Sequence, residues 1–253
     1  MRTWLQGWLR LARFAAMATI RLPWVATQPA LFLPAFYQAL VPALALAMAC
    51  GAATGVVVWI HVRESLVRVA GPGAAIYIPQ GLALAVLLEL APLTAGLLTA
   101  GRSGARLAAE LGAMRNTEQI DALEALGQSP VAWLVAPRLL AHMLALPLLT
   151  GVLALVALAA GAAAESLGGS LTWQRYWIEV GRVMDWRDVL PAHLKTVVFG
   201  WLVAVIGCYN GIYVDGGTEG VGRAATRGVV QSILAVVLVN VALVRLIQIL
   251  QAA

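Results

Sequence analysis

Residues 74–100 read AAIYIPQGLALAVLLELAPLTAGLLTA, and their only charged side chain is Glu89. About 20 apolar residues are enough for a helix to cross a bilayer, so this stretch predicts a membrane span with a carboxylate near its middle. A charge at that depth costs roughly 2.5–3.5 kcal/mol on insertion scales, so Glu89 should point away from lipid. Pro92 has no N–H, and it therefore leaves the carbonyl of Leu88 without its helical partner beside that carboxylate.

The composition of the whole chain agrees with this interpretation. Of its 253 residues, 61% are hydrophobic and only 11% are charged, whereas soluble domains carry about 25% charged residues. The mean hydropathy is +0.85. We therefore predict an all-α polytopic membrane protein that forms a single domain over residues 1–253. Five spans are expected at about residues 35–60, 74–100, 139–164, 189–214 and 228–250.

The connections between these spans differ in character. Residues 61–73 predict a short loop, 101–138 a long polar segment, and 211–227 a glycine-rich polar loop. Residues 165–188 are amphipathic and rich in tryptophan, which favours a segment on the membrane surface. Placing the N-terminus in the cytoplasm leaves roughly twice as many arginines inside as outside, so we predict that orientation.

Residues 1–24 predict an amphipathic helix that lies in the membrane interface. At 100° per residue, Arg10 and Arg13 fall on one side, and Trp4 and Trp8 fall broadly opposite. Arginine suits the lipid headgroups and tryptophan the boundary with the acyl chains, so these four residues should anchor the helix. The segment lacks the unbroken apolar core of a cleavable signal peptide.

Two roles fit an acidic residue in the middle of a span. Glu89 either locks one helix against another or lies on a transport path, and we favour the path because charges inside membranes generally mark such paths. A carboxylate can also carry protons, which keeps an ion- or proton-coupled secondary transporter as the alternative function. Such transporters are often built from inverted repeats, into which five spans do not divide equally.

Several other classes of function lack the residues that they need. A nucleotide-binding P-loop ends in Lys-Ser or Lys-Thr after a glycine-rich turn, but the only lysine, Lys195, stands in AHLKT without preceding glycines. We therefore expect no ATP hydrolysis by this chain, and no nucleophile–base pair indicates another enzyme. Basic patches with interleaved aromatic residues are absent, which argues against nucleic acid. Two cysteines and three histidines show no metal-ligand spacing: Cys50, Cys208, His61, His142 and His193.

The polar segment between the second and third spans contains a short helix signal. Asn116 and Gln119 form a possible capping box, which starts a helix at about residues 117–126. Acidic residues at spacing three give it one acidic edge, and Gly127 and Pro130 end it. The pattern alone leaves two interpretations open, a solvated loop helix or a surface on which a partner docks.

Longer motifs distinguish these interpretations. The motifs are GRSGARLAAELGAM at 101–114, ELGAMRNTEQIDALEALGQSP at 110–130, LVAPR at 134–138, LLELAPLTAGLLTAGR at 87–102, DWRDVLPAHLKTVVFG at 185–200 and GVGRAATRGVVQS at 220–232. Together they resemble the MlaE/YrbE family, the permease subunits of bacterial lipid-transporting ABC systems. The resemblance covers about residues 42–244 and keeps the motifs in the family's order.

The resemblance implies two functional sites. The helix near 117–126 would be the coupling helix that sits in a groove of the ATPase subunit. We expect that site to comprise Glu110, Arg115, Thr117, Glu118, Gln119 and Asp121. A lipid cavity would lie between two copies of the permease. We expect it to be lined by Glu89, Leu88, Pro92 and Tyr77.

The resemblance also implies an assembly in the bacterial inner membrane. A homodimer of this chain would bind two ABC ATPase subunits, which carry the ATP and Mg²⁺, so that this chain itself needs no cofactor. A hexamer of MCE proteins would receive or deliver phospholipid on the periplasmic side, and some systems of the family add a small STAS-domain protein.

The chain departs from the family pattern at two places. Leu88 stands where the family often has an arginine directly before the glutamate of the second span, so Glu89 is expected to lack that counter-ion. Trp59 and His61 stand where the first span usually ends with glycine and glutamine. The chemistry of the cavity is therefore expected to differ from the family pattern at these positions.

Overall fold

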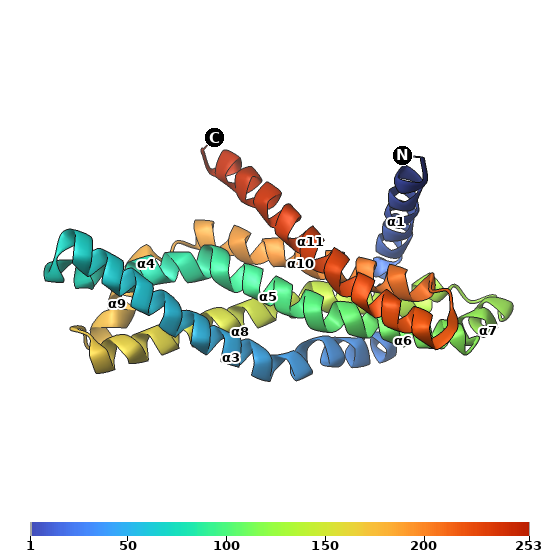
Figure 1. Ribbon diagram of the computed structural model, residues 1–253, viewed down its shortest axis with the longest axis horizontal. Coiled ribbons are helices and arrows are strands. Elements are labelled where there is room, and N and C mark those ends of the chain that lie inside the picture. Colours follow the sequence, from blue (N-terminus) through green and yellow to red (C-terminus); the bar gives the residue numbers. More distant parts are fainter. Residues whose placement is uncertain (1, 253) are drawn as a thin grey trace. The chain divides into compact units, whose positions relative to one another are not determined.

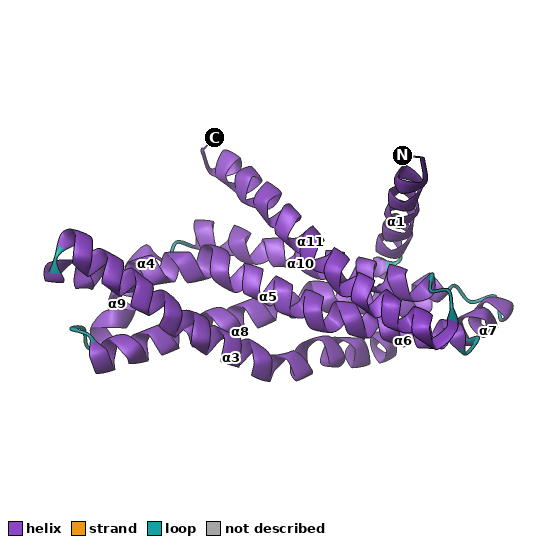
Figure 2. Cartoon of the chain, in the orientation of Figure 1, coloured by secondary structure: helices purple, strands orange, loops and turns teal. Residues whose placement is uncertain are grey.

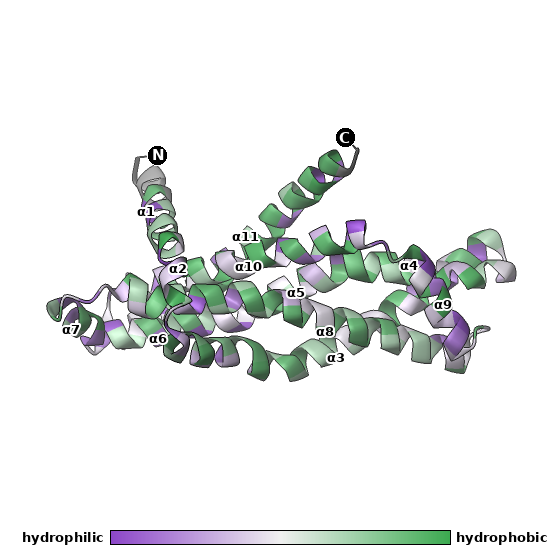
Figure 3. Cartoon of the chain, turned by 180° about the vertical axis from the view of Figure 1, so that it is seen from behind, coloured by the Kyte–Doolittle hydropathy of each residue, from purple (hydrophilic) through white to green (hydrophobic). Residues whose placement is uncertain are grey.

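A computed structural model describes the backbone of residues 2–252 and the side chains of residues 7 and 9–250. The described part contains helices and connecting turns but no strand (Figure 2). Among these residues, five helical stretches are long and apolar enough to cross a membrane: Pro29–Ala70, Pro72–Asn116, Val131–Gly168, Trp186–Ile212 and Gly217–Leu250. Figure 3 shows them mostly in green, the hydrophobic colour. The predicted all-α polytopic membrane fold is confirmed.

Figure 1 shows the elements in chain order. They are α1 Arg2–Ile20, α2 Leu22–Val25, α3 Pro29–Ala70, η1 Pro72–Tyr77, α4 Ile78–Ala85, η2 Val86–Leu90, α5 Ala91–Thr99, η3 Ala100–Gly104, α6 Ala105–Asn116, α7 Gln119–Ala125, η4 Val131–Val135, α8 Ala136–Gly168, α9 Trp173–Val183, α10 Trp186–Ile212 and α11 Gly217–Ala252. The first η element is a 3₁₀ helix, and the other three are π-helical turns, two inside the second span and one at the start of the third.

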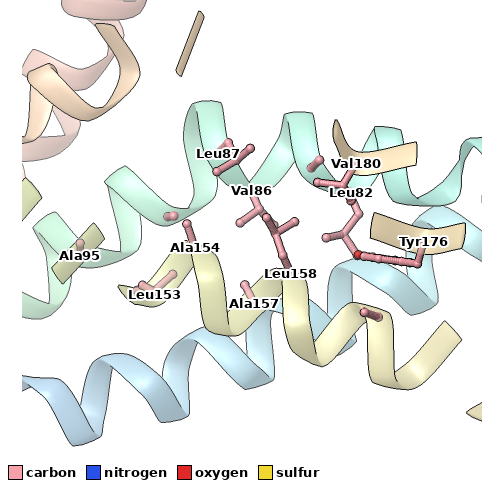
Figure 4. Packing of buried hydrophobic residues seen from close by; sticks show 13 residues of the cluster. Leu82, Val86, Leu87, Ala95, Leu153, Ala154, Ala157, Leu158, Tyr176 and Val180 are labelled. Carbon is pink, nitrogen blue, oxygen red and sulfur yellow. The ribbon is translucent and has the colours of Figure 1, made fainter. Parts of the chain in front are cut away.

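The chain forms two compact units. The first comprises Met1–Pro42, Gly96–Leu146 and Val197–Ala253, and the second comprises Ala43–Ala95 and Pro147–Thr196. The core of the second unit lies where α4 and η2 face α8 and α9 (Figure 4). Leu82 and Val86 meet Leu158 there, and Tyr176 and Val180 close the cluster. Apolar burial of this kind contributes about 25 cal/mol per Å².

Two glycines bring α3 directly onto α8 within the second unit. A Cβ atom at Gly55 would lie 2.0 Å from the carbonyl oxygen of Ala157, and one at Gly51 would lie 2.7 Å from that of Leu153. No other residue type fits at such a distance from a backbone. The small-xxx-small spacing in this segment therefore serves a close helix contact inside the chain.

The core of the first unit holds α1 against the rest of that unit. Phe14 and Ala18 are buried with Leu107 of α6 and Cys208 of α10. The indole Nε1 of Trp201 also donates a hydrogen bond of 2.9 Å to the hydroxyl of Thr19. The predicted helix at the N-terminus is therefore present, but part of its apolar face packs on protein. The Trp4 and Trp8 side chains lie outside the described residues.

Three predicted loops are shorter than the sequence indicated. The segment 101–138 is mostly helical, because η3 and α6 continue the second span to Asn116, and η4 begins the third at Val131. The small residues in this segment allow the helix to continue against a neighbour. A Cβ atom at Gly228 of α11 would lie 2.8 Å from the carbonyl oxygen of Gly104.

The other two predicted loops are also shorter than expected. Helix α3 continues to Ala70, where we expected a loop from residue 61, and α10 and α11 leave only residues 213–216 outside helices. The turn between α10 and α11 is tight because Gly216 and Gly217 have φ angles of 96° and 63°, which residues with a Cβ rarely adopt.

Candidate functional site

The backbone around Glu89 is a π-helical turn within the second span. In η2 the N–H of Ala91 donates to the carbonyl of Val86, five residues earlier. Pro92 follows and has no N–H to give to the carbonyl of Leu88. Single π turns of this kind often occur at functional sites. The expected free carbonyl is therefore available for a side chain to bind.

Lys195 of α10 binds two acceptors of the second span, the carboxylate of Glu89 and the carbonyl of Leu88. Its Nζ donates a hydrogen bond of 2.8 Å to Glu89 Oε1 and another of 2.8 Å to the carbonyl oxygen of Leu88. The lysine side chain is only 2% exposed, whereas that of Glu89 is 42% exposed. One face of the ion pair is thus closed by protein, and the carboxylate reaches the surface of the second unit.

This pair corrects one expectation from the sequence. Leu88 replaces the arginine of the family pattern, but Glu89 still has a cation, supplied by a helix 106 residues further along the chain. A signal for it exists in the sequence. Lys195 is the only lysine of the chain, and it lies in a span where an ionisable residue needs a partner.

Tyr77 does not join this group. It lies at the end of η1, with 57% of its surface exposed. Glu89 lies twelve positions further along the chain, which corresponds to about 18 Å along a helix. The expected cavity residues therefore form a cluster of Glu89, Leu88 and Pro92, with Tyr77 apart from them.

Two buried carboxylates in the second unit were missed by sequence reasoning. Glu165 is completely buried and accepts hydrogen bonds from Trp59 Nε1 at 2.7 Å and from Arg63 Nη1 at 2.8 Å. The backbone N–H of Ser170 adds a third at 2.9 Å. Glu165 therefore ties the end of α3 to the turn after α8. Trp59, which departs from the family pattern, contributes directly to this tie.

The second buried carboxylate, Glu179, lies on α9. Gln80 donates to it at 2.9 Å, and the guanidinium groups of Arg175 and Arg182 lie at 2.9 and 3.1 Å. The neighbouring Tyr176 is fully buried, and burial raises the pKa of its hydroxyl. These contacts fix α9 against α4, so we assign them a structural role.

Helix α7 is the other region that the sequence singled out. Ile120 is completely buried and anchors it, whereas Glu118, Asp121 and Glu124 are exposed along one edge. Leu126 follows the helix and is 75% exposed. Figure 3 shows both hydrophobic and hydrophilic colours on this helix. An acidic edge and an exposed leucine remain available for a partner.

The start of α7 differs from the expected capping box. Asn116 is the last residue of α6, and Glu118 precedes α7 with a left-handed φ of 59° and no side-chain cap. Instead, the Thr117 hydroxyl donates to the carbonyl of Ala113 at 3.0 Å and accepts from Gln119 Nε2 at 3.1 Å. The two helices thus meet in a tight turn. The predicted end is confirmed, because Gly127 has a φ of 72°.

The expected coupling residues divide into two groups. Arg115 forms an ion pair with Asp121, which ties the end of α6 to α7. Glu110 lies between two arginines, at 3.5 Å from Arg106 and in an ion pair with Arg138. The two-residue contact fixes α7 against the end of α6, and the three-residue contact joins α6 to α8. Glu118 and Glu124 are the acidic residues of the edge that form no ion pair with another described residue.

These features define a class of protein. The chain is a multi-pass helical membrane protein with an ion pair between its second and fourth spans and a short, exposed acidic helix between its second and third spans. The family described as Permease MlaE matches residues 32–246, so the chain belongs to the MlaE permease family.

Relatives carry names in keeping with this family. The chain is 36% identical over 197 residues to a probable ABC transporter permease protein of Synechocystis sp., which covers 78% of this chain and 74% of that protein. It is 35% identical over 163 residues to the intermembrane phospholipid transport system permease protein MlaE of Haemophilus influenzae, covering 62% and 60%. The identity to the chloroplastic protein TRIGALACTOSYLDIACYLGLYCEROL 1 of Arabidopsis thaliana is 39% over 163 residues, covering 61% and 44%.

Proposed function

We propose that this chain is the membrane-spanning subunit of an ABC transporter that moves phospholipid between the bacterial inner membrane and a periplasmic MCE protein. Membership of the MlaE permease family supports this proposal, as does the name of the Haemophilus influenzae relative. Two ATPase subunits would bind and hydrolyse ATP with Mg²⁺. Two copies of this chain would form the centre of the complex, with a hexamer of MCE subunits and, in some systems, a STAS-domain protein.

The observation that carries the proposal is the surface of α7. The helix is short, its backbone is fixed by the buried Ile120 and by the Arg115–Asp121 ion pair, and its acidic edge is exposed. A rigid, charged projection suits the transmission of force from a partner better than a mobile loop does. We assign this surface to the ATPase, with Glu118 and Glu124 steering the encounter.

The Glu89–Lys195 pair supports the proposal that the lipid path contains a polar contact. It places a carboxylate, 42% exposed, on an apolar span, with its cation buried behind it. A phospholipid headgroup carries both hydrogen-bond donors and charges, so it can pair with this carboxylate where acyl chains cannot. We therefore propose that Glu89 contacts headgroups during transfer, with Leu88 and Pro92 beside it.

The contact with the ATPase is tested by charge reversal on α7. Affinity purification of a Glu118→Lys/Glu124→Lys variant should recover much less ATPase than the unmodified chain, because the complementary charges are lost. Glu64→Lys is the matched control, since Glu64 is also exposed and lies outside α7. Equal recovery of the ATPase by all three proteins would contradict the assignment of α7.

The cargo is tested separately. Lipid mass spectrometry of the complex extracted with its partners should find phospholipid enriched over the detergent-extracted membrane. If the complex carries another lipid class, the chain is still assigned to a lipid transporter, but its substrate is that class and not phospholipid.

A further inference from the structure

Five arginines from three helices surround one cavity in the first unit. The cavity has a volume of about 840 Å³ and is lined by Arg10 and Arg13 of α1, Arg115 of α6, and Arg223 and Arg227 of α11. Ligand sites commonly enclose roughly 300–1,000 Å³, so this one is large enough for a small molecule or a lipid headgroup. It is distinct from the Glu89–Lys195 pair, which lies in the second unit.

Packing of α1 brings its arginines to this cavity. The ring of Phe14 meets those of Tyr209 and Tyr213 edge to face, with centroids 5.5 and 6.0 Å apart. Arg10 lies one helical turn before Phe14, and Arg13 directly precedes it, so the buried phenylalanine holds both at the cavity. The polar face of α1, expected from the sequence to meet only headgroups, therefore turns partly toward protein.

The charges around the cavity are not balanced. Arg223 pairs with Glu219, and Arg115 pairs with Asp121. Asp215 is the one carboxylate of the lining itself, so the five lining arginines exceed this carboxylate and the two paired ones by two charges. Within the described side chains, Arg10, Arg13 and Arg227 form no ion pair. Gathering like charges in one concave site costs energy unless an anion enters it.

The chemistry of the lining indicates the kind of anion. Arginine presents a planar fork of donors that matches phosphate oxygens, and it is the usual residue for phosphate recognition. Tyr209, Tyr213 and Met17 supply apolar and amphipathic surface beside the arginines. The arginine distribution predicts that the N-terminus, and with it this cavity, faces the cytoplasm. Basic pockets between membrane helices on that side are suited to anionic headgroups.

We propose that this cavity binds a phosphate group, presented either by an anionic phospholipid of the cytoplasmic leaflet or by a soluble phosphate compound. The site is separate from the path proposed for transported lipid, and it does not depend on the identity of the cargo. Arg115 of α6 both lines the cavity and pairs with Asp121 of α7. This side chain therefore connects the cavity to the helix that we assign to the ATPase.

The test measures lipid binding by the purified, delipidated chain in detergent, using native mass spectrometry. Phosphatidylglycerol and phosphatidylethanolamine with identical acyl chains are the two probes. One arginine near an anionic headgroup contributes about fivefold in affinity. A double variant, Arg10→Gln/Arg227→Gln, should therefore lose about 25-fold in the preference for phosphatidylglycerol.

The control variant removes the same charge elsewhere. Arg68→Gln/Arg245→Gln neutralises two exposed arginines outside the cavity, so it should keep the unmodified preference. A second arm adds inorganic phosphate and inositol hexakisphosphate as soluble competitors. Displacement of phosphatidylglycerol from the unmodified chain shows that soluble phosphates also enter the site, and failure to displace it assigns the site to lipid.

Two results would overturn the proposal. One is that the unmodified chain shows no preference for phosphatidylglycerol and binds neither soluble phosphate. The other is that both double variants lose the preference equally, since a general effect of net charge then explains it. All four substituted arginines are solvent-accessible, and circular dichroism of each variant verifies that the helices are retained.

Discussion

Replacement of either member of the Glu89–Lys195 pair should destabilise the chain. The size of the effect should depend on which polar group loses its partner. Lys195→Met leaves the carbonyl of Leu88 without its donor, and an unsatisfied buried acceptor costs about 1–3 kcal/mol. Glu89 also loses a bond, but its side chain is 42% exposed and keeps access to its surroundings. The expected loss is about 2–3 kcal/mol.

The reverse change should cost more. Glu89→Leu leaves an ammonium group that is 2% exposed and retains only the carbonyl of Leu88. Removing one partner of a buried ion pair costs about 3–5 kcal/mol. Glu89→Gln should fall below both, because its amide oxygen still accepts from Lys195. The double variant Glu89→Leu/Lys195→Met should be more stable than Glu89→Leu alone, since no charge is left behind.

Thermal unfolding of the detergent-solubilised protein measures these differences. In chains of 150–250 residues, 1 kcal/mol shifts Tm by about 2–4 °C, so Lys195→Met should lower Tm by about 4–12 °C. Glu64→Gln is the control, because the exposed Glu64–Arg68 pair is worth about 0.3–0.5 kcal/mol. If Glu89→Leu and Lys195→Met shift Tm no more than this control, or their effects add without coupling, the reasoning is refuted.

The remaining predictions concern packing, a buried carboxylate and topology. Gly55→Ala should lower Tm strongly, since its Cβ would lie 2.0 Å from the Ala157 carbonyl oxygen and overpacking costs about 1–3 kcal/mol. Gly151→Ala on α8, with nothing within 4 Å of the new Cβ, should leave Tm unchanged or raise it, and an equal loss at both sites would contradict the packing. Glu165→Gln should cost about 1.5–3 kcal/mol in unfolding free energy, because the charged bond to Arg63 is lost, and an unaltered Tm would remove Glu165 from the structural ties. A cysteine at Glu64 should react with a membrane-impermeant reagent in intact cells while one at Glu124 should not, and the opposite pattern would reverse the orientation.

Sequence reasoning succeeded where one local pattern determines the structure. The apolar lengths gave the five spans, because a helix is the usual way for a single apolar stretch to satisfy its backbone in lipid. Pro92 indicated the free carbonyl of Leu88, which follows from covalent structure alone. Gly127 indicated the end of α7 in the same way.

The sequence was less informative where contacts between residues far apart in the chain determine the structure. The partner of Glu89 is 106 residues away, so no pattern around Leu88 identifies it. Glu165 looked like the polar end of an apolar span until Trp59 and Arg63 were seen to bind it. Much of the predicted loop 101–138 proved helical, with Gly104 packed closely against Gly228, a contact that local polarity does not reveal.

The residues at Glu89 also change how one obvious variant should be interpreted. Glu89→Lys would not test the lipid path alone. In the structure it places a second ammonium group beside Lys195, so it should destabilise the fold as well. Glu89→Gln keeps a hydrogen-bond acceptor for Lys195, which makes it the better probe of transport.

We proposed that this chain provides the membrane path for ATP-driven phospholipid transfer. The most direct measurement reconstitutes it in proteoliposomes with its ATPase and follows labelled phospholipid moving to or from the soluble domain of the MCE partner. Transfer should require ATP, and Glu118→Lys/Glu124→Lys on α7 should strongly reduce it. Transfer at the same rate without ATP, or no transfer by a complex that hydrolyses ATP, would contradict it.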